Sequence, residues 1–496
     1  MSNALYDALF APHVGNGAVF LECDDGTSIS YDAFLKRAAQ VAHVLLAAGV
    51  SPGDRVVVQA PKLADTIALY AACVQVGAVY LPLNTAYTQA ELDYFVGDAA
   101  PTLLVCDVKD ARDFETLAAK FGAALHTLGE GGSLSAAADT MSTSCDVVSR
   151  ASDDLAALLY TSGTTGRSKG AMLSHNNLLS NAQTLQEYWQ ITSVDRLIHA
   201  LPIFHTHGLF VALNTALLAG ATVRFMEVFN LDAILEELPH STLLMGVPTF
   251  YTRLLGDARF TQDLCASMRL FISGSAPLLA ETHQAFEART GHRILERYGM
   301  TETNMITSNP YEGERVAGTV GFPLPEVEVK ITNPETGEPL PTGEIGMIEV
   351  RGENVFKGYW QMPEKTAEEL RPDGFFLTGD LAQQDAQGRI SIVGRAKDLI
   401  ISGGYNIYPK EIEDVLNDLD GVGESAVFGV PHSDFGESVI AAIVADGAVD
   451  EDAIRAEVEA RLARFKHPRE YQVMEALPRN TMGKVQKNVL RETYDA

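Results

Sequence analysis

YTSGTTGRSKG, residues 160–170, is the stretch that decides the fold. Its eleven residues include three glycines, five aliphatic hydroxyls and two cations, directly after the apolar run Leu155–Leu159, which is typical of a buried strand. Glycines let the backbone approach an anion closely, and hydroxyls, amides and cations donate to phosphate oxygens. The spacing is not that of a Walker A loop. We therefore predict a phosphate-binding loop after a strand, with a polar surface turn as the alternative.

Bulk properties limit the classes of protein. A chain of 496 residues is expected to form two or more domains. Its formal net charge of -28 argues against nonspecific nucleic-acid binding and against docking on anionic membranes. Any anionic ligand must therefore be held by local cations.

The five cysteines lie far apart and contain no C-x-x-C pair, which predicts reduced thiols and a cytoplasmic location. The N-terminal residues lack a basic region and do not read as a secretory signal. The uncharged run Leu197–Val223 is long enough for a bilayer, but it is interrupted by Pro202, His205, His207, Gly208, Asn214 and Gly220. No membrane span is predicted.

Three patterns of predicted secondary structure follow one another along the chain. Up to about residue 294, β-rich runs alternate with helical stripes, such as the helix expected over Tyr31–Ala48, which indicates parallel sheets with crossover helices. Between about 319 and 393, short strands separated by turns predict a small antiparallel barrel. After about Lys397 the pattern is that of a compact α+β unit.

Eight motifs then occur in one order and together resemble the adenylate-forming superfamily, which contains acyl-CoA synthetases, firefly luciferase and the adenylation domains of peptide synthetases. The resemblance covers the chain essentially end to end. The motifs are YTSGTTGRSKG (160–170), LPIFHTHGL (201–209), GVPTFY (246–251), SGSAP (273–277), ERYGMTET (296–303), FLTGD (376–380), GRAKDLIISGGYNIYPKEIE (394–413) and PRNTMGK (478–484).

The resemblance implies an α/β fold with a large N-terminal adenylation domain, residues 1–394. That domain would hold two αβαβα-type layered subdomains and a small β-barrel at about 319–394. A hinge at 395–398, centred on Lys397, would lead to a mobile α+β lid domain, residues 399–496. A few backbone torsions can absorb such a domain rotation.

The resemblance also assigns the nucleotide site. ATP would contact Thr161, Ser162, Gly163, Thr164, Thr165, Lys169, Ser275, Tyr298, Thr301, Asp380 and Arg395. Tyr298 would lie against adenine, Asp380 would accept from both ribose hydroxyls and Arg395 would donate to the same ribose. Mg²⁺, which needs few protein oxygens beside substrate phosphates, would be held by Thr161 and Glu302; the alternative is that Glu302 caps a helix.

Lys484 is the residue expected to carry the first half-reaction. Carboxylate and ATP are both anionic, so an ammonium that bridges them offsets their repulsion and the charge that develops at the α-phosphate. Acylation of Lys484 by a lysine acetyltransferase would remove this charge and switch the enzyme off. A solvated tail lysine is the alternative.

The second half-reaction needs a thiol channel. By resemblance, Gly403 and Gly404 would edge the channel for the pantetheine chain of CoA in a second lid pose, since glycines admit a thin chain between backbone walls. His205 would line the carboxylate pocket and gate the thiol. Its role in proton transfer, or as a hydrogen-bonded core histidine, stays open.

Arg297 stands where many relatives have glycine, and the set ERYGMTET with FHTHGL resembles malonyl-CoA synthetases. A guanidinium there would shorten the pocket and clamp a second carboxylate, with His207 and Met305 as further lining residues. This points to malonate or methylmalonate. Arg297 could instead turn outward and pair with Glu296; Arg224 is a second clamp candidate, and Arg269 discriminates nothing.

The sequence therefore predicts an ATP-dependent, AMP-forming ligase that makes malonyl-CoA through an acyl-adenylate and uses CoA as co-substrate. A ligase for short or aryl monocarboxylates is the rival within enzymes. An inactive nucleotide-binding sensor is the rival from another class.

Overall fold

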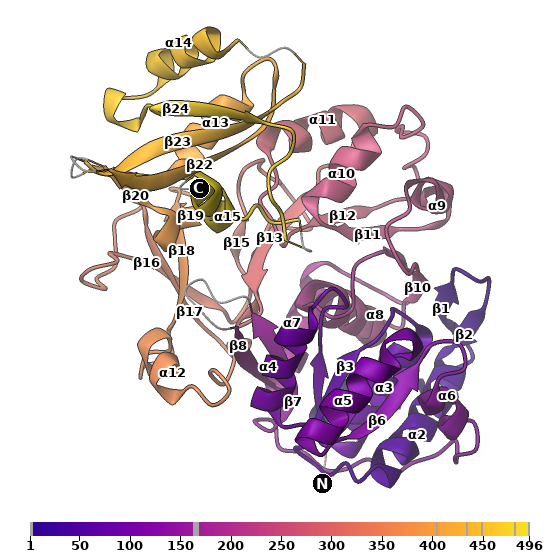
Figure 1. Ribbon diagram of the computed structural model, residues 1–496. Coiled ribbons are helices and arrows are strands. Elements are labelled where there is room, and N and C mark those ends of the chain that lie inside the picture. The colour runs from indigo at the N-terminus through magenta and orange to yellow at the C-terminus, as the bar shows by residue number, and fades with distance from the viewer. Residues whose placement is uncertain are drawn as a thin grey trace.

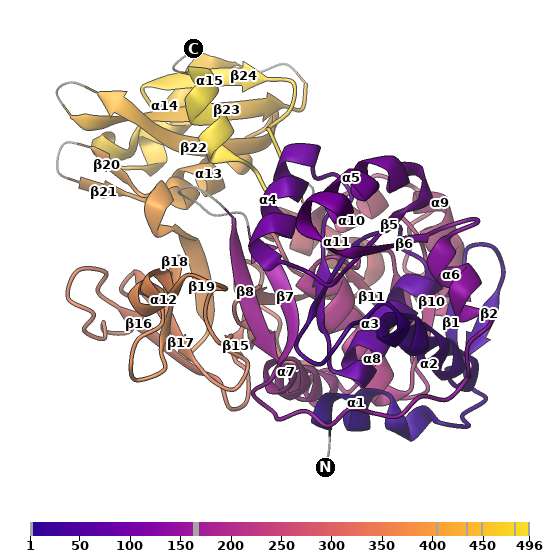
Figure 2. The same ribbon diagram turned by 60° about the horizontal axis from the view of Figure 1, so that its bottom comes forward.

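The computed structural model describes residues 3–161, 168–402, 405–432, 435–447, 450–480 and 483–494. Two αβ-layered bodies form the lower and right parts of the molecule, a smaller β-rich body lies beside them, and the C-terminal unit sits above (Figures 1 and 2). The predicted α/β class, with a large N-terminal part and a small C-terminal one, is confirmed.

A six-stranded sheet with the order β6-β5-β3-β4-β7-β8 carries the first layered body. The strands from β6 to β7 in this order all pair in parallel, and β8 runs antiparallel to β7. The strands are β3 (Arg55–Gln59), β4 (Val79–Pro82), β5 (Leu103–Asp107), β6 (Ala124–Leu128), β7 (Leu155–Thr161) and β8 (Lys169–Ser174). The helices of this part are α1 (Ala4–Leu9), α2 (Tyr31–Ala47), α3 (Ala64–Val76), α4 (Gln89–Ala99), α5 (Ala111–Phe121) and α6 (Ser133–Ala138), with 3₁₀ turns η1 (Ala11–His13) and η2 (Val108–Asp110).

Apolar patterning explains how the two faces of this sheet are covered. Leu92, Phe95, Phe114 and Leu117 of α4 and α5 pack on one face. The helix α3 is buried almost throughout, because it lies in the large core that the first sheet shares with the second.

A nine-stranded mixed sheet, ordered β15-β14-β13-β12-β11-β9-β10-β1-β2, carries the second body. Its strands are β1 (Val19–Cys23), β2 (Ser28–Ser30), β9 (Arg196–His199), β10 (Thr222–Phe225), β11 (Leu243–Gly246), β12 (Leu270–Ser273), β13 (Leu295–Met300), β14 (Asn304–Ser308) and β15 (Phe322–Pro323). The helices are α7 (His175–Tyr188), α8 (Asn214–Ala219), α9 (Leu231–Glu237), α10 (Pro248–Leu255), α11 (Ala280–Thr290), the π-helix η3 (His207–Leu213) and the 3₁₀ turn η4 (Leu238–His240).

The uncharged run Leu197–Val223 is thus a strand, a loop and two short buried helices of this core. Among the residues that the structure describes, no helix is both long and apolar enough to cross a bilayer.

The β-rich body is a four-stranded antiparallel sheet of β16 (Glu328–Thr332), β17 (Gly346–Arg351), β18 (Phe376–Gln384) and β19 (Ile390–Arg395), with α12 (Pro363–Glu369) on the connection between β17 and β18. Residues 319–394 are all described, and the outer strands β16 and β19 do not pair with each other. On its outer edge, Ile390 of β19 exchanges backbone hydrogen bonds with Val320 and Gly321, ahead of β15. The small barrel expected at about 319–394 thus contains this antiparallel sheet, and its closure stays a prediction.

The chain leaves β19, makes one 3₁₀ turn, η5 (Ala396–Asp398), and enters the C-terminal unit. Its five strands are β20 (Ile400–Ser402), β21 (Tyr405–Ile407), β22 (Val422–His432), β23 (Gly436–Ala445) and β24 (Glu470–Met474), and its helices are α13 (Pro409–Asn417), α14 (Glu451–Arg461), α15 (Lys487–Tyr494) and the turn η6 (Arg464–Lys466). Two separate apolar clusters cover the two faces of this sheet, so the unit has its own core.

Candidate active site

Three residues expected at the nucleoside meet at one point. Asp380 and Arg395 face each other across β18 and β19, and Arg395 Nε lies 2.6 Å from Asp380 Oδ1. Tyr298, on β13, donates its hydroxyl to Asp380 Oδ2 at 2.5 Å. Asp380 is buried, and burial together with Asp380 raises the pKa of Tyr298 well above its usual value. The fold thus brings together a ring, a carboxylate and a guanidinium from two different sheets.

Thr161 and Glu302 also meet. Thr161 Oγ1 lies 3.4 Å from Glu302 Oε1, although 141 positions separate them, and burial raises the pKa of Glu302. A hydroxyl and a buried carboxylate are hard oxygen donors that suit Mg²⁺. Over the described ranges no cluster of three acidic, histidine or cysteine side chains could hold a metal.

Two residues of this region, Tyr359 and Glu369, were not predicted from the sequence. Tyr359 donates its hydroxyl toward Glu369 at 2.7 Å and toward Glu302 at 3.1 Å. Lys169 Nζ lies 3.2 Å from both oxygens of Glu369 and 4.0 Å from the centre of the Tyr359 ring. Because 200 positions separate Lys169 from Glu369, no local pattern reveals the pair.

Four predicted ATP contacts, Ser162, Gly163, Thr164 and Thr165, and both predicted channel glycines, Gly403 and Gly404, lie outside the described residues. They stay predictions. The flanks of the loop are described: Tyr160 donates to Asp98 Oδ2 at 2.5 Å, and Tyr94 donates to the Ser168 carbonyl at 2.8 Å. These two contacts anchor both ends of the loop to α4.

Arg297 is buried in the second sheet, with 3% of its surface exposed. Its Nε and Nη2 atoms have no hydrogen-bond partner in the described structure. The guanidinium lies against Gly274, where an added Cβ would come within 2.4 Å of Arg297 Cζ. Burial lowers the pKa of Arg297 to about 9, so the group is still cationic at neutral pH.

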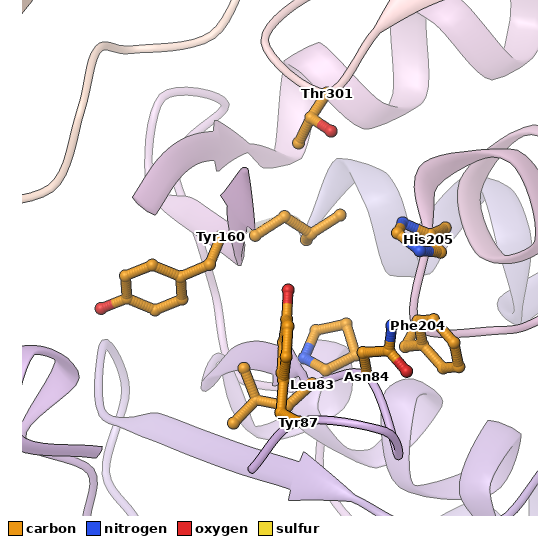
Figure 3. A pocket seen from close by; sticks show the side chains of 9 residues that line it. Leu83, Asn84, Tyr87, Tyr160, Phe204, His205 and Thr301 are labelled. Atoms are coloured by element: carbon orange, nitrogen blue, oxygen red, sulfur yellow. The ribbon is translucent and has the colours of Figure 1, made fainter. Parts of the chain in front are cut away.

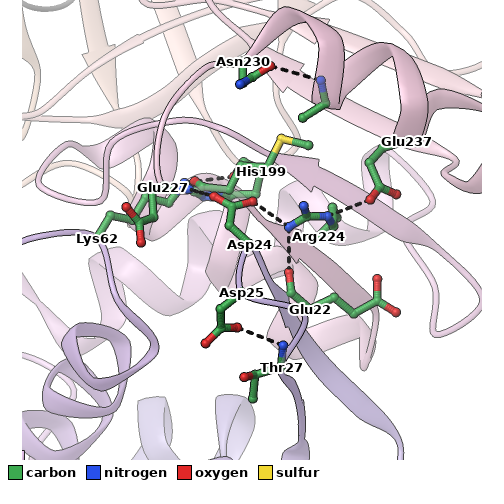
Figure 4. Close-up of polar contacts among 12 residues, drawn as sticks. Glu22, Asp24, Asp25, Thr27, Lys62, His199, Arg224, Glu227, Asn230 and Glu237 are labelled. Atoms are coloured by element: carbon green, nitrogen blue, oxygen red, sulfur yellow. Dashed lines mark hydrogen bonds and ion pairs between the residues drawn. The ribbon is translucent and has the colours of Figure 1, made fainter. Parts of the chain in front are cut away.

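The outward alternative for Arg297 is wrong. Its neighbour Glu296 is itself buried and receives the Leu278 amide at 3.4 Å, and burial raises the pKa of Glu296 to about 8. Arg224 is not a second clamp either, because its guanidinium pairs with Glu237 and Asp24 at 2.7 and 2.9 Å (Figure 4).

His207 of the LPIFHTHGL segment lies close enough to Arg297 to feel its charge. His207 Nδ1 is 3.1 Å from Ser275 Oγ, and His207 Nε2 has no partner among the described residues. Burial and the Arg297 charge lower the pKa of His207 well below its usual value. Ser275, which was predicted to contact ATP, thus contacts a residue predicted to line the acyl pocket. Met305, also predicted to line that pocket, is buried and packs against Gly299 across the β13–β14 pair.

His205 and Thr301 line a pocket between the two layered bodies (Figure 3). The other lining residues are Pro82, Leu83, Asn84, Tyr87, Leu159, Tyr160 and Phe204. Burial lowers the pKa of His205 to about 4, so its imidazole is neutral at neutral pH. This placement fits the expected lining role of His205.

The C-terminal unit contacts the nine-stranded body close to the predicted nucleotide residues. Gly483 lies beside Thr249 of α10, with an added Cβ 3.8 Å from Thr249 Cγ2. Lys484 is exposed to solvent, yet its pKa is lowered from the usual lysine value. Lost hydration is the largest cause, and the positive charges of Arg395 and Lys397 add to it. Asp380 and Glu302 act on Lys484 in the opposite direction. The ammonium therefore shares one electrostatic environment with the predicted ribose and magnesium residues.

Comparison with protein families agrees with this arrangement. Residues 11–360 match the AMP-binding enzyme model, and residues 411–484 match the C-terminal domain model of AMP-binding enzymes. The chain belongs to the AMP-binding enzyme family. Its two matched regions correspond to the layered bodies with part of the β-rich sheet and to the C-terminal unit.

Individual family members cover the whole chain. It is similar to ATP-bound MatB of Rhodopseudomonas palustris, at 56% identity and a TM-score of 0.98 over 100% of this chain and 99% of that one. It is 38% identical to a feruloyl-CoA synthase of Amycolatopsis sp, over 95% of this chain and 94% of that protein. It is 34% identical to the malonate–CoA ligase of Arabidopsis thaliana, over 95% of this chain and 85% of that protein.

The apo structure of the same MatB superposes less well on this AMP-binding enzyme, with a TM-score of 0.87 against 0.98 for the ATP-bound structure. The arrangement that brings Lys484 to the cleft is therefore the one seen in an ATP-bound relative.

Proposed function

We propose that this enzyme is a malonate–CoA ligase that forms malonyl-AMP and pyrophosphate from malonate and ATP, and then malonyl-CoA and AMP. The observation that carries the proposal is Arg297, a buried cation whose guanidinium lacks a protein acceptor on two of its nitrogens. A buried charge without a partner is strongly unfavourable, and a second carboxylate of the substrate would supply that partner. A relative named as a malonate–CoA ligase supports the same choice.

In the first step, one malonate carboxylate attacks the α-phosphate of ATP. Tyr298, Asp380 and Arg395 would hold the nucleoside, and Lys169 with the loop 161–165 would hold phosphates. Mg²⁺, bound by Thr161 and Glu302, would neutralise phosphate charge. Lys484 would bridge carboxylate and α-phosphate, where charge develops, while Arg297 and neutral His207 hold the distal carboxylate away from the reacting one.

In the second step, the CoA thiol attacks the acyl carbonyl and AMP leaves. Lys484 would have to withdraw, because the same cleft must admit the pantetheine chain. A rotation at 395–398, with Lys397 as its centre, between domains 1–394 and 399–496 would do this and would bring Gly403 and Gly404 to the channel that His205 lines. The single 3₁₀ turn at Ala396–Asp398 is a short connection that a few torsions can redirect.

Other acids and another class remain to be tested against this proposal. Methylmalonate would add one methyl to the same clamp. A feruloyl-CoA synthase among the relatives keeps aryl monocarboxylates as the rival substrates. Retention of Thr161, Glu302, Asp380, Arg395 and Lys484 argues against an inactive nucleotide sensor.

The test is CoA-dependent AMP release from malonate, methylmalonate, succinate, acetate, butyrate, 4-coumarate and ferulate, for the wild type and for Arg297→Gly. Malonate should have the highest kcat/KM in the wild type. In Arg297→Gly it should fall by about 100-fold or more, as expected when a charge-assisted bidentate contact is lost, while acetate and butyrate gain relative to malonate. An unchanged order of preference would exclude the clamp.

Two expectations lie outside these observations and stay predictions. Acetylation of Lys484 by an acetyltransferase would abolish adenylation, and an acetylated enzyme with full activity would refute this. A cytoplasmic location rests on the cysteine pattern alone; all five thiols are free in the structure.

A further inference from the structure

A buried lysine outside the nucleotide site, Lys62, contacts His199 at the end of β9 (Figure 4). Lys62 lies in the loop between β3 and α3, with 9% of its surface exposed. Its Nζ donates to His199 Nδ1 at 2.9 Å, to the His199 carbonyl at 2.8 Å and to the Met226 carbonyl at 2.5 Å. An ammonium has three protons, and all three are used here.

Counting protons fixes the state of this pair. His199 Nε2 lies 2.8 Å from the Gly208 carbonyl, which can only accept, so Nε2 must carry a proton. Four acceptors (Nδ1 and three carbonyls) therefore face four protons, three on Lys62 and one on His199. The balance requires one positive charge shared by the pair. Burial lowers the pKa of Lys62 well below its usual value while Asp24 and Glu227 act in the opposite direction, and burial together with the Lys62 charge lowers the pKa of His199 to about 3. Because the amine is the more basic of the two groups, we assign the charge to Lys62 and the neutral Nε2–H tautomer to His199.

The Gly208 carbonyl that His199 holds belongs to the first turn of η3, directly after His207. This turn packs closely on the loop before it, because an added Cβ at Gly208 would come within 2.1 Å of the Pro202 carbonyl oxygen. His207 contacts Ser275, and the preceding Gly274 packs on the Arg297 guanidinium. One contiguous series of contacts thus runs from Lys62 to the proposed malonate clamp.

Lys62 also joins the two layered bodies. It follows β3 of the six-stranded sheet, whereas His199 ends β9 and Met226 follows β10 of the nine-stranded sheet. The pocket lined by His205 lies between the same two bodies. A shift of one body against the other at Lys62 would therefore move η3 relative to the rest of the acyl pocket.

We infer that Lys62, acting through the His199 tautomer and the Gly208 carbonyl, is a positioning residue that sets His207 in the acyl pocket and so determines affinity for the acid substrate. The inference rests on the proposed function of that pocket. Lys62 does not contact the reacting atoms, so its removal should weaken acid binding and leave ATP binding almost unchanged.

The first experiment compares Lys62→Met with the wild type and with Tyr31→Phe. Tyr31 is a matched control, since its hydroxyl donates to the Ala221 carbonyl at 2.7 Å in the same core and lies 3.3 Å from the Ala216 carbonyl of α8, without contacting Lys62 or His199. For Lys62→Met, KM for malonate should rise by about tenfold or more, the size of one lost hydrogen bond to a charged group, while KM for ATP changes by less than about twofold. Tyr31→Phe should change neither KM. Equal rises in both KM values for Lys62→Met, or no rise for malonate, would overturn the inference.

A second pair of variants keeps the test independent of the folding of Lys62→Met. In His199→Gln the side-chain amide can still donate to the Gly208 carbonyl and its oxygen can accept from Lys62, whereas His199→Leu can do neither. His199→Gln should retain a malonate KM near the wild-type value, and His199→Leu should lose as much as Lys62→Met. Equal KM values for His199→Gln and His199→Leu would refute the role of this hydrogen bond.

A spectroscopic readout separates positioning from general bracing. In ¹⁵N-histidine-labelled wild type at neutral pH, His199 should give the signals of a neutral ring protonated at Nε2; in Lys62→Met, Nδ1 loses its donor and these signals should change. An unchanged tautomer signature in Lys62→Met would contradict the inference. If the wild type itself did not use malonate, the proposed function would fail first, and the two failures would be distinguishable.

Discussion

Arg297 illustrates how one residue can specify a substrate at a cost to the empty protein. Its guanidinium is buried, charged and short of acceptors, which disfavours the free state. The backbone of Gly274 makes room for it, since any side chain there would meet the guanidinium. Arg297 and Gly274 therefore act as a pair, and the glycine is required by packing rather than by a turn.

Gly274→Ala tests this pair while Arg297 itself is not substituted. The new methyl would lie 2.4 Å from Arg297 Cζ, so the flexible guanidinium must move while the backbone can stay. KM for malonate should rise by about tenfold or more, because a displaced guanidinium loses its charge-assisted contact, and KM for ATP should stay within about twofold. Steady-state kinetics with each substrate varied would measure this. A malonate KM equal to that of the wild type would show that Arg297 does not bind the acid from its observed position.

At the scale of elements, one carboxylate ties together the starts of three neighbouring strands. Asp195, just before β9, accepts from Thr242 Oγ1 at 2.7 Å, ahead of β11, and from Arg269 at 2.7 and 2.8 Å, ahead of β12. Arg269 lies near the beginning of its strand, and Arg297 lies within β13. This explains why Arg269 carries no information about substrate: it stabilises the edge of the sheet opposite to the ends of the strands that lead to the site.

Arg269→Met should lower stability and leave substrate preference unchanged. Asp195 is almost fully buried, and removing one partner of a buried pair typically costs about 3–5 kcal/mol. Thermal unfolding would show a lower Tm, and the substrate panel would show the order of the wild type. A changed order of substrates with an unchanged Tm would contradict this assignment.

The whole molecule must bind anions despite a net charge of -28. It does so by gathering cations from distant parts of the chain: Arg297 from the nine-stranded sheet, Arg395 from the β-rich sheet, and Lys484 from the C-terminal unit. In the structure Lys484 shares the site with these cations, and its pKa is lowered by lost hydration and by Arg395 and Lys397. Assembly of the site is therefore coupled to the position of the C-terminal unit.

Lys484→Ala should separate the two half-reactions. Pyrophosphate release from ATP and malonate should fall by about 1,000-fold or more, the scale seen when a group that stabilises transition-state charge is lost. Thioester formation from synthetic malonyl-adenylate and CoA should stay within about threefold of the wild type, because the proposed rotation would have taken Lys484 out of the site before this step. Equal losses in both assays would refute the assigned role.

The pH dependence should also distinguish adenylation from thioester formation. The pKa of Lys484 is lowered by lost hydration and by Arg395 and Lys397, with Asp380 and Glu302 opposing, and only its protonated form can bridge two anions. Adenylation should therefore fall as pH rises through this lowered pKa, earlier than for an ordinary lysine. Thioester formation from malonyl-adenylate should lack that limb. Identical alkaline limbs for the two steps would contradict the prediction.

The sequence by itself determined the order of elements and the α/β class, and it pointed to Arg297 and to the expected nucleotide residues, because period, glycine density and ordered motifs are local properties. It did not determine how the strands at 319–394 pair, since strand pairing is not local. Only the tertiary structure decided that Arg297 is buried without an acceptor, that Ser275 contacts His207, and that Glu369 and Tyr359 surround Lys169. Only it placed Lys62 against His199, 137 positions away. Such contacts depend on how two sheets pack and on which buried groups then lack partners, and no spacing along the chain encodes that.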